Sequence, residues 1–195
     1  MPPSPPVLAA FSRAFFVMNL QSNDFELFEL PVQFEQSREL IDTRWKELLR
    51  QAHPDKFAAQ GAVAQRLAMQ WSVRINEAYQ RLKDPLARAS YLCEVHGAPI
   101  QAENNTAMPS AFLMQQMEWR EALDDCKAIK VVDSKIEGLE KLLEEVDASH
   151  AASLKQIASL LDVDQNFTAA VGQVRALMFI EKFAQEVQHQ LDATS

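Results

Sequence analysis

Residues 44–57 read RWKELLRQAHPDKF, and this stretch decides how the first half of the chain folds. Apolar side chains precede the His-Pro-Asp triplet at the spacings of three and four that mark one face of a helix. Proline then ends the helix, because it lacks a backbone donor and disfavours a helical conformation at the residue before it. A second, longer apolar stripe follows and predicts an antiparallel helical hairpin with the triplet at its turn. The stripes are Ile41, Trp45, Leu48 and Ala52 before the turn, and Ala64, Leu67, Ala68, Trp71, Ile75, Ala78, Tyr79 and Leu82 after it.

The composition favours an all-α protein. The 195 residues include only 4 glycines, whereas Leu, Ala, Glu, Gln and Met, which lose little side-chain entropy in a helix, are common. No run of about 18 apolar residues occurs, so we expect no membrane span. The 2 cysteines, Cys93 and Cys126, are too few for a disulfide scaffold and fit a reducing compartment, so we expect a cytoplasmic protein.

Turn signals divide the chain into segments. Residues 1–22 begin with prolines and carry one basic residue, Arg13, which matches neither a secretory signal nor a transit peptide. We expect a loose extension there, with Met18 as an alternative start and a vestigial targeting sequence as the less favoured interpretation. The other expected segments are a first domain at 23–96, a linker at 97–108 and a second domain at 109–195.

Helix signals refine both domains. In the first, Asn23 or Asp24 caps a short helix that ends before Pro31, and a fourth helix ends on Gly97 as a left-handed cap. In the second, three amphipathic helices over about 109–127, 133–161 and 165–191 have short connections and predict an antiparallel bundle. Their apolar stripes include Ile136, Leu139, Leu143, Val146, His150, Leu154, Ile157 and Leu161, then Leu177, Ile180, Phe183, Ala184, Val187 and Leu191. We interpret His150 as a core-edge histidine with a backbone partner.

The charge is unevenly distributed. Residues 1–104 carry 11 Lys+Arg and 12 Asp+Glu, a net −1, whereas residues 105–195 carry 8 and 15, a net −7. Residues 44–88 carry nine basic and four acidic residues, a local +5. One basic patch and one acidic half favour contact with two protein partners over nucleic acid, which would need a basic face on the second domain.

The His53-Pro54-Asp55 turn has a simple interpretation and a functional one. Proline ends helices and aspartate accepts hydrogen bonds from backbone N–H groups, so the triplet could be an ordinary turn. A stiff hairpin beside Lys46 and Arg50, however, would present an aromatic donor or acceptor, a locked dihedral and an anion to a partner. No nucleophile–base pair lies near it in the sequence, so we do not expect catalysis.

Three stretches resemble a J-domain: LFELP at 27–31, RWKELLRQAHPDKF, and INEAYQRLKDPLARASYL at 75–92. The resemblance covers about residues 23–96, with the His-Pro-Asp triplet as its defining motif. It implies that this turn and the basic helix before it dock on a DnaK-type chaperone and stimulate its ATP hydrolysis. The residues it assigns to chaperone binding are His53, Pro54, Asp55, Lys56, Arg44, Lys46 and Arg50.

The helix at 109–127 has a second face that core packing does not require. About 100° separates successive residues, so one arc collects an apolar core stripe and the other mixes large apolar residues with acids. The simple interpretation is a widened core with solvated acids; the functional one is an exposed interaction patch, completed by Phe179 of the last helix. The core stripe is Phe112, Trp119, Leu123 and Cys126, and the second face is Leu113, Met114, Met117, Glu118, Glu121 and Asp125.

The order J-domain, linker, AFLMQQMEWREALDD and VRALMFIEKF resembles the bacterial form of HscB, a co-chaperone family of iron–sulfur cluster assembly. The resemblance implies an L-shaped, non-enzymatic adaptor without a cofactor, whose bundle binds the scaffold protein IscU and delivers it to the HscA-type chaperone. It assigns scaffold binding to Leu113, Met114, Met117, Glu118, Glu121, Asp125 and Phe179.

Two alternatives stay open. The bundle could be a general client binder or a homodimer interface. The protein could instead be a small helical enzyme or metal carrier that uses Cys93, His96 and Cys126. A closed zinc site needs four protein ligands, so we expect buried structural thiols and no metal. No Gly-rich phosphate loop occurs, so we expect no ATP binding by the chain itself.

Overall fold

The computed structural model describes residues 22–101 and 108–194, and every regular element in them is helical. The all-α prediction is therefore confirmed. The chain divides into two compact units, residues 1–88 and 89–195, and the division falls inside helix α5 (Pro85–Val95). The expected extension at 1–22 lies almost wholly outside the described residues, as do residues 102–107 of the expected linker. The predicted domain boundaries stay predictions.

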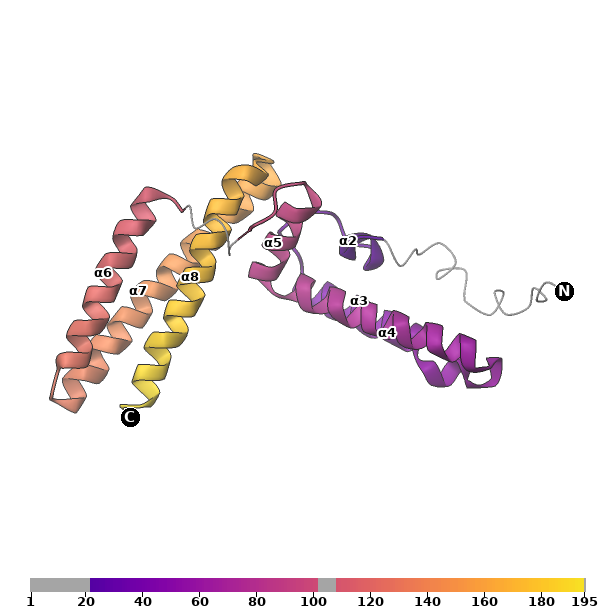
Figure 1. The fold of residues 1–195 in the computed structure, drawn as a ribbon, viewed down its shortest axis with the longest axis horizontal. Helices are drawn as coiled ribbons and strands as arrows, with labels where there is room; N and C mark the ends of the chain where they lie inside the picture. The colour runs from indigo at the N-terminus through magenta and orange to yellow at the C-terminus, as the bar shows by residue number, and fades with distance from the viewer. Residues whose placement is uncertain (1–21, 102–107, 195) are drawn as a thin grey trace. The chain divides into compact units, whose positions relative to one another are not determined.

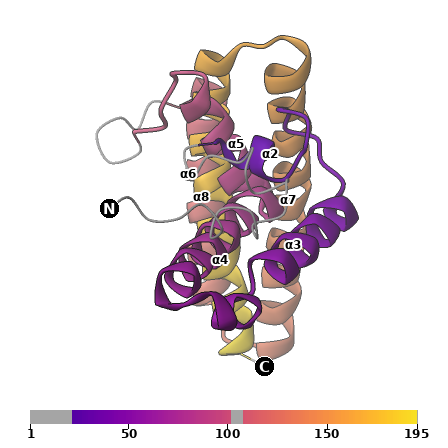
Figure 2. The same cartoon turned by 90° about the vertical axis from the view of Figure 1, so that its right-hand side faces the viewer.

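The first unit is built around a helical hairpin. Helices α3 (Arg38–Ala52) and α4 (Ala62–Lys83) run side by side and antiparallel, joined by the 3₁₀ turn η1 (Pro54–Gln60), as Figures 1 and 2 show. The predicted stripes face each other, since all their members are buried or half-buried. The stripes thus form the core that joins α3 to α4.

Capping residues set where these helices begin and end. Asn23, one of the two expected caps, forms a capping box with Glu26 at the start of α2 (Asp24–Leu27). Ser37 caps α3 by accepting a hydrogen bond from the backbone of Leu40 at 3.3 Å. Asp84 has an extended backbone before Pro85, which ends α4, and its side chain accepts from the backbone N–H of Ala87 at 2.7 Å, which caps the start of α5. Polar residues at the turns therefore set the ends of the helices, as the sequence predicts.

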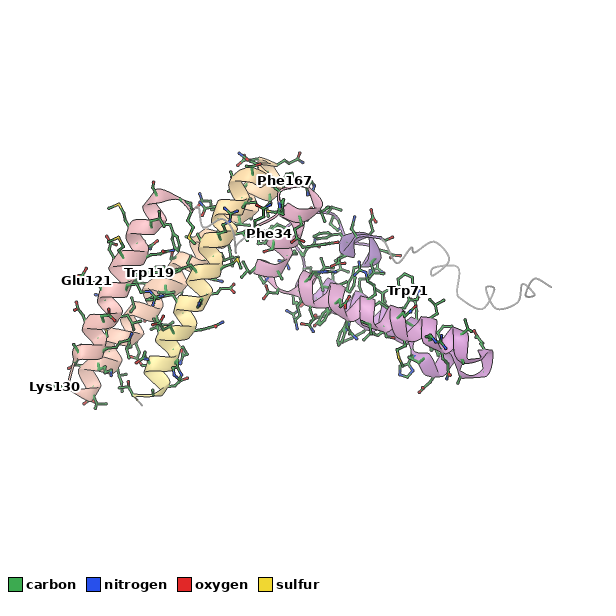
Figure 3. All side chains as sticks on the ribbon, viewed as in Figure 1. Phe34, Trp71, Trp119, Glu121, Lys130 and Phe167 are labelled. Atoms are coloured by element: carbon green, nitrogen blue, oxygen red, sulfur yellow. The ribbon has the colours of Figure 1, made fainter. Side chains whose placement is uncertain are left out.

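Buried charges tie the short elements to the hairpin. Asp24 is fully buried and receives the guanidinium groups of Arg74 and Arg81, each at 2.6 Å. Arg88, also buried, donates to the backbone carbonyl of Phe34 at 2.7 Å and to that of Leu82, and lies over the ring of Phe34, which Figure 3 labels. These ion pairs and hydrogen bonds anchor α2 and the segment before α3 to α4.

The second unit contains an antiparallel three-helix bundle of α6 (Ser110–Ala128), α7 (Val132–Ala158) and α8 (Phe167–Asp192), visible in Figure 1. The predicted bundle is therefore confirmed. Two boundaries differ: Pro109 is the N-cap of α6 rather than its first residue, and α7 ends in a π-helical turn, η2 (Ser159–Val163). Gly97 closes α5 at φ +77°, the left-handed cap that the sequence predicts.

Aromatic rings fill the centre of the bundle. Phe179, Phe183 and Trp119 stack in a row, with centroid distances of 5.9 Å and 5.6 Å between neighbours. Phe112 meets both ends of this row edge-on, at 6.1 Å from Trp119 and 5.8 Å from Phe179. We call these four residues the aromatic row. Such offset and edge-on pairs stabilise by more than their buried area alone.

One expectation about the bundle is wrong. His150 lies at the half-buried edge of the core, as the sequence suggests, but its partner is not the backbone. Its Nε2 lies 3.3 Å from a carboxylate oxygen of Glu181 on α8. The acid stands on a neighbouring helix, and the α7 sequence alone contains no sign of it.

Candidate functional site

The His53-Pro54-Asp55 turn, hereafter the HPD turn, projects from the end of the hairpin. The side chain of His53 is 59% exposed and that of Asp55 is 90% exposed. His53 has an extended backbone, φ −62° and ψ 124°, as expected before a proline. Its Nδ1 accepts a hydrogen bond from the backbone N–H of Asp55 at 3.3 Å. Nδ1 therefore faces the turn, whereas the Asp55 carboxylate faces solvent.

Two contacts with α4 hold the HPD turn in place. Phe57 is buried and packs with Ala64 and Ala68 of α4 in a small cluster beneath the turn. The hydroxyl of Ser72 donates to the terminal carbonyl of α3, that of Ala52, at 3.2 Å. Both contacts connect the end of α3 to α4 and so restrain the HPD turn.

The basic residues predicted beside the turn differ in their surroundings. Lys46, Arg50 and Lys56 are exposed, and no ion pair with another described residue engages them. Arg44 is only 35% exposed, and its guanidinium lies 3.0 Å from Glu29 and 3.3 Å from Glu47. The charge of Arg44 is thus already partly balanced within the molecule, while the other three cations face solvent.

The second predicted surface lies on the outer face of α6. Leu113, Met114 and Met117 are 46%, 67% and 74% exposed. In Figure 3, Trp119 points toward the other helices of the bundle and Glu121 points away from them. The face that the sequence marks as dispensable for the core is therefore exposed. We call it the α6 patch: Leu113, Met114, Met117, Glu118, Glu121 and Asp125, all exposed.

Phe179 differs from the α6 patch residues, because it is half-buried and belongs to the aromatic row. It lies at the rim of the bundle core, on α8. Its neighbour Met178, which the helical pattern did not mark, is 39% exposed.

Comparisons with known proteins agree over nearly the whole chain. A co-chaperone protein HscB homolog from Burkholderia multivorans is 47% identical over 178 residues, which cover 90% of this chain and 98% of the homolog. The chain belongs to the HscB family of co-chaperones. A homolog from Paraburkholderia xenovorans is 46% identical over 174 residues, 89% of this chain and 97% of that protein. The family model of the HscB C-terminal oligomerisation domain matches residues 108–188.

Solved HscB structures share the fold. HscB from Vibrio cholerae matches with a TM-score of 0.75 at 35% identity, covering 89% of this chain and 100% of that one. Human HscB matches with a TM-score of 0.77 at 21% identity, over 89% of this chain and 84% of the human one, and supports the fold alone. HscB proteins are co-chaperones rather than an enzyme family, which agrees with the prediction of a non-enzymatic protein.

The three candidate metal ligands, Cys93, His96 and Cys126, pack against other residues of the second unit. The Cys93 thiol lies 3.9 Å from the carbonyl of Phe167, and the His96 ring stacks on the Phe167 ring at 3.8 Å. Cys126 is buried in the bundle core. Burial raises the pKa of the Cys93 thiol to about 11. Burial also raises the pKa of the Cys126 thiol. Both thiols are therefore held in their neutral form at neutral pH.

Residues 22–101 and 108–194 contain no group of three or more His, Cys, Asp or Glu side chains placed to hold a metal ion. None of their helices is both long and apolar enough to cross a membrane.

Proposed function

We propose that this HscB-family protein is an adaptor of iron–sulfur protein maturation in the bacterial cytoplasm. In this proposal it binds an IscU-type scaffold protein, presents it to an HscA-type chaperone of the DnaK class, and stimulates that chaperone's ATPase. One observation carries the proposal: the HPD turn is exposed at the end of a well-packed hairpin, with Asp55 90% accessible. A turn with only a structural role would not need these groups in solvent.

The chaperone would bind the HPD turn and the basic face of α3. His53 and Asp55 offer a ring and a carboxylate, while Lys46, Arg50 and Lys56 carry exposed positive charge. Unbalanced surface charge attracts an acidic partner over several ångströms and mainly raises the association rate. We therefore assign recognition to the HPD turn and electrostatic steering to the three cations.

The scaffold would bind the α6 patch together with Phe179. Three exposed apolar side chains give the patch anchors that lose water on binding, and Glu118, Glu121 and Asp125 surround them with negative charge. This arrangement suits a partner with a basic, partly apolar surface. We expect a modest affinity, about micromolar or about −8 kcal/mol, since a delivery protein must release its cargo.

The two surfaces lie on different units, so one molecule can hold both partners at once. Tethering them raises the effective concentration of scaffold at the chaperone without any new contact. Hydrolysis would then convert the chaperone to the form that grips the scaffold and favours cluster release.

One observation favours a second candidate, in which the patch is a homodimer interface. The family model that matches residues 108–188 is described as an oligomerisation domain, and exposed apolar side chains can pair two copies. Sedimentation of the protein alone separates the candidates: the adaptor proposal predicts a monomer at concentrations at which the scaffold binds. A dimer that Met114→Glu dissociates would support the second candidate instead.

Calorimetric titration with a purified IscU-type scaffold tests the adaptor directly. The double variant Leu113→Ala and Met114→Ala removes two anchors and should weaken binding by about tenfold or more, since each buried methylene contributes about 0.8 kcal/mol. Val131→Ala with Val132→Ala is the matched control, because these side chains are also exposed, at 62% and 54%, but lie outside the patch. Equal effects of both double variants, or no binding by the unmodified protein, would contradict scaffold binding at this patch.

A further inference from the structure

Arg120 lies on the side of α6 that faces α8, between the α6 patch and Phe179. Its guanidinium forms an ion pair with Glu186 of α8 at 2.6 Å. The same group lies over two rings of the aromatic row, 5.6 Å from the centre of Phe179 and 5.1 Å from that of Phe183. One side chain thus connects the acidic α6 surface to two rings of the row, Phe179 at its end and Phe183 in its middle.

The Arg120 guanidinium that contacts the two rings is itself held by an ion pair. The Glu186 carboxylate restrains the guanidinium, and a planar guanidinium can lie flat on an aromatic face while it donates hydrogen bonds at its edge. The Arg120 side chain is 49% exposed, so cation–π contacts there are worth about 0.5–1 kcal/mol. That energy is small beside the stability of a bundle, but it is large enough to select one orientation of a half-buried ring.

Phe179 needs such a restraint. Phe112 meets its ring from the edge and Phe183 meets one face, both from inside the bundle. Arg120 is the contact that reaches the ring from the exposed surface of α6. We propose that Arg120 is a positioning residue for scaffold binding: it holds the Phe179 ring in the orientation in which it completes the α6 patch.

This inference rests on the proposed scaffold binding and adds a residue to it. Arg120 stands next to Glu121 and two residues after Glu118, so a role by charge alone would oppose the acidic character of the patch. Its ion pair with Glu186 cancels much of that charge. The contribution assigned to Arg120 is therefore geometric and passes through Phe179.

A double-mutant cycle on scaffold affinity tests this. Arg120→Met keeps a long apolar side chain but removes the guanidinium, and should weaken scaffold binding by about three- to fivefold, the equivalent of the cation–π contacts. The same substitution in a Phe179→Ala background should have almost no further effect, because the ring on which it acts is gone. An equal loss in both backgrounds would mean that Arg120 contacts the scaffold itself, and would overturn the positioning role. So would no loss in either background.

Two further variants separate geometry from charge. Lys127 lies 3.7 Å from the same Glu186 carboxylate, but it is Arg120 and not Lys127 that lies over the two rings. Lys127→Met is therefore the matched control and should leave affinity within about twofold. Arg120→Lys keeps the charge but loses the planar group, and should fall between the unmodified protein and Arg120→Met. If Arg120→Met does not fold, as judged by its circular dichroism, Arg120→Lys carries the cycle.

A measurement without the partner makes the inference independent of the proposed function. With 4-fluorophenylalanine at position 179, the ¹⁹F resonance should be narrow in the unmodified protein. Arg120→Met should broaden or split it, because the ring then samples more than one rotamer. An unchanged resonance would overturn the inference even if the scaffold binds, whereas a lack of scaffold binding with a broadened resonance would leave the restraint established and contradict only the proposed function.

Discussion

At the scale of single residues, the HPD turn depends on a backbone conformation that glycine supplies. Gly61, between η1 and α4, has φ +94° and ψ 169°, a region that residues with a Cβ rarely enter. Apart from its two chain neighbours, no residue has an atom within 4 Å of the place where a Cβ would stand, so the constraint is the backbone itself. The chain can re-enter a helix after the turn because a glycine stands there.

Gly61→Ala should therefore destabilise the first unit by about 1–3 kcal/mol, the usual cost of such strain. Urea unfolding followed by circular dichroism measures the change. Gly172→Ala is the control with the opposite sign: Gly172 lies inside α8, its nearest neighbour would be at an ordinary 3.9 Å, and alanine there should stabilise by about 0.5–1 kcal/mol. A neutral Gly61→Ala would show that the turn has no special conformation.

The buried thiol of Cys93 predicts a pH dependence at the alkaline end. Its pKa is raised by burial from 9.0 to about 11, so the unfolded chain loses this proton first. Between these values the unfolded state binds fewer protons, and the free energy of unfolding falls as the pH rises, by at most about 1.4 kcal/mol per pH unit. Below that window the thiol is neutral in both states and contributes no pH dependence.

Other groups also titrate in this range, so Cys93→Ala is the reference. Urea unfolding at about pH 8 and about pH 10.5 should show a smaller loss of stability for Cys93→Ala than for the unmodified protein. Parallel curves for the two proteins would show that Cys93 ionises equally in both states.

At the residue scale, the sequence predicts which side chains of the turn are exposed, but not which partners the charged side chains have. The exposure of His53 and Asp55 follows from the sequence, because a proline turn between two amphipathic helices must lie at the end of a hairpin. The involvement of Arg44 with Glu29 does not follow, since Glu29 lies fifteen positions earlier and only the packing of α2 on the hairpin brings it close. Partners of charged side chains depend on tertiary structure.

At the scale of elements, α6 shows what a helical period can predict. The residues assigned to its core stripe are all buried, and those assigned to its outer face are all exposed. The second helix of the bundle was predicted less well, because Leu142 and Ser153 are buried although the stripe omitted them. At about 100° per residue, the buried residues of α7 share one narrow arc. Leu142 and Ser153 lie on one side of this arc, whereas the stripe followed its other side, where Leu143 and Leu154 are only half-buried.

The ion pairs between α2 and α4 give a test at the scale of elements. Asp24 is fully buried and pairs with Arg74 and Arg81, so Asp24→Asn should leave two cations without their counter-charge and destabilise the first unit by about 3 kcal/mol or more. The same substitution at Asp42, which is 35% exposed and pairs with Arg38, should cost much less, because water screens an exposed ion pair. Similar losses at the two positions in urea unfolding would contradict the importance of burial.

At the scale of the whole molecule, the two units carry different chemistry. The first presents a basic surface around the HPD turn, and the second presents an acidic face with apolar anchors. Fold class and both candidate surfaces could be predicted from sequence, since each depends on helical period and turn chemistry. The aromatic row and the Arg120 contact could not, because they join residues of α6 to residues of α8 that lie more than fifty positions away.

The most direct test of the adaptor is single-turnover ATP hydrolysis by a purified HscA-type chaperone. The unmodified protein should accelerate hydrolysis, and adding the scaffold should accelerate it again, because both partners are then held together. His53→Gln should abolish the acceleration while its circular dichroism stays unchanged, since His53 is exposed and supports no core packing. The central claim is that the chaperone binds the HPD turn. It would be contradicted if folded His53→Gln accelerated hydrolysis as much as the unmodified protein does.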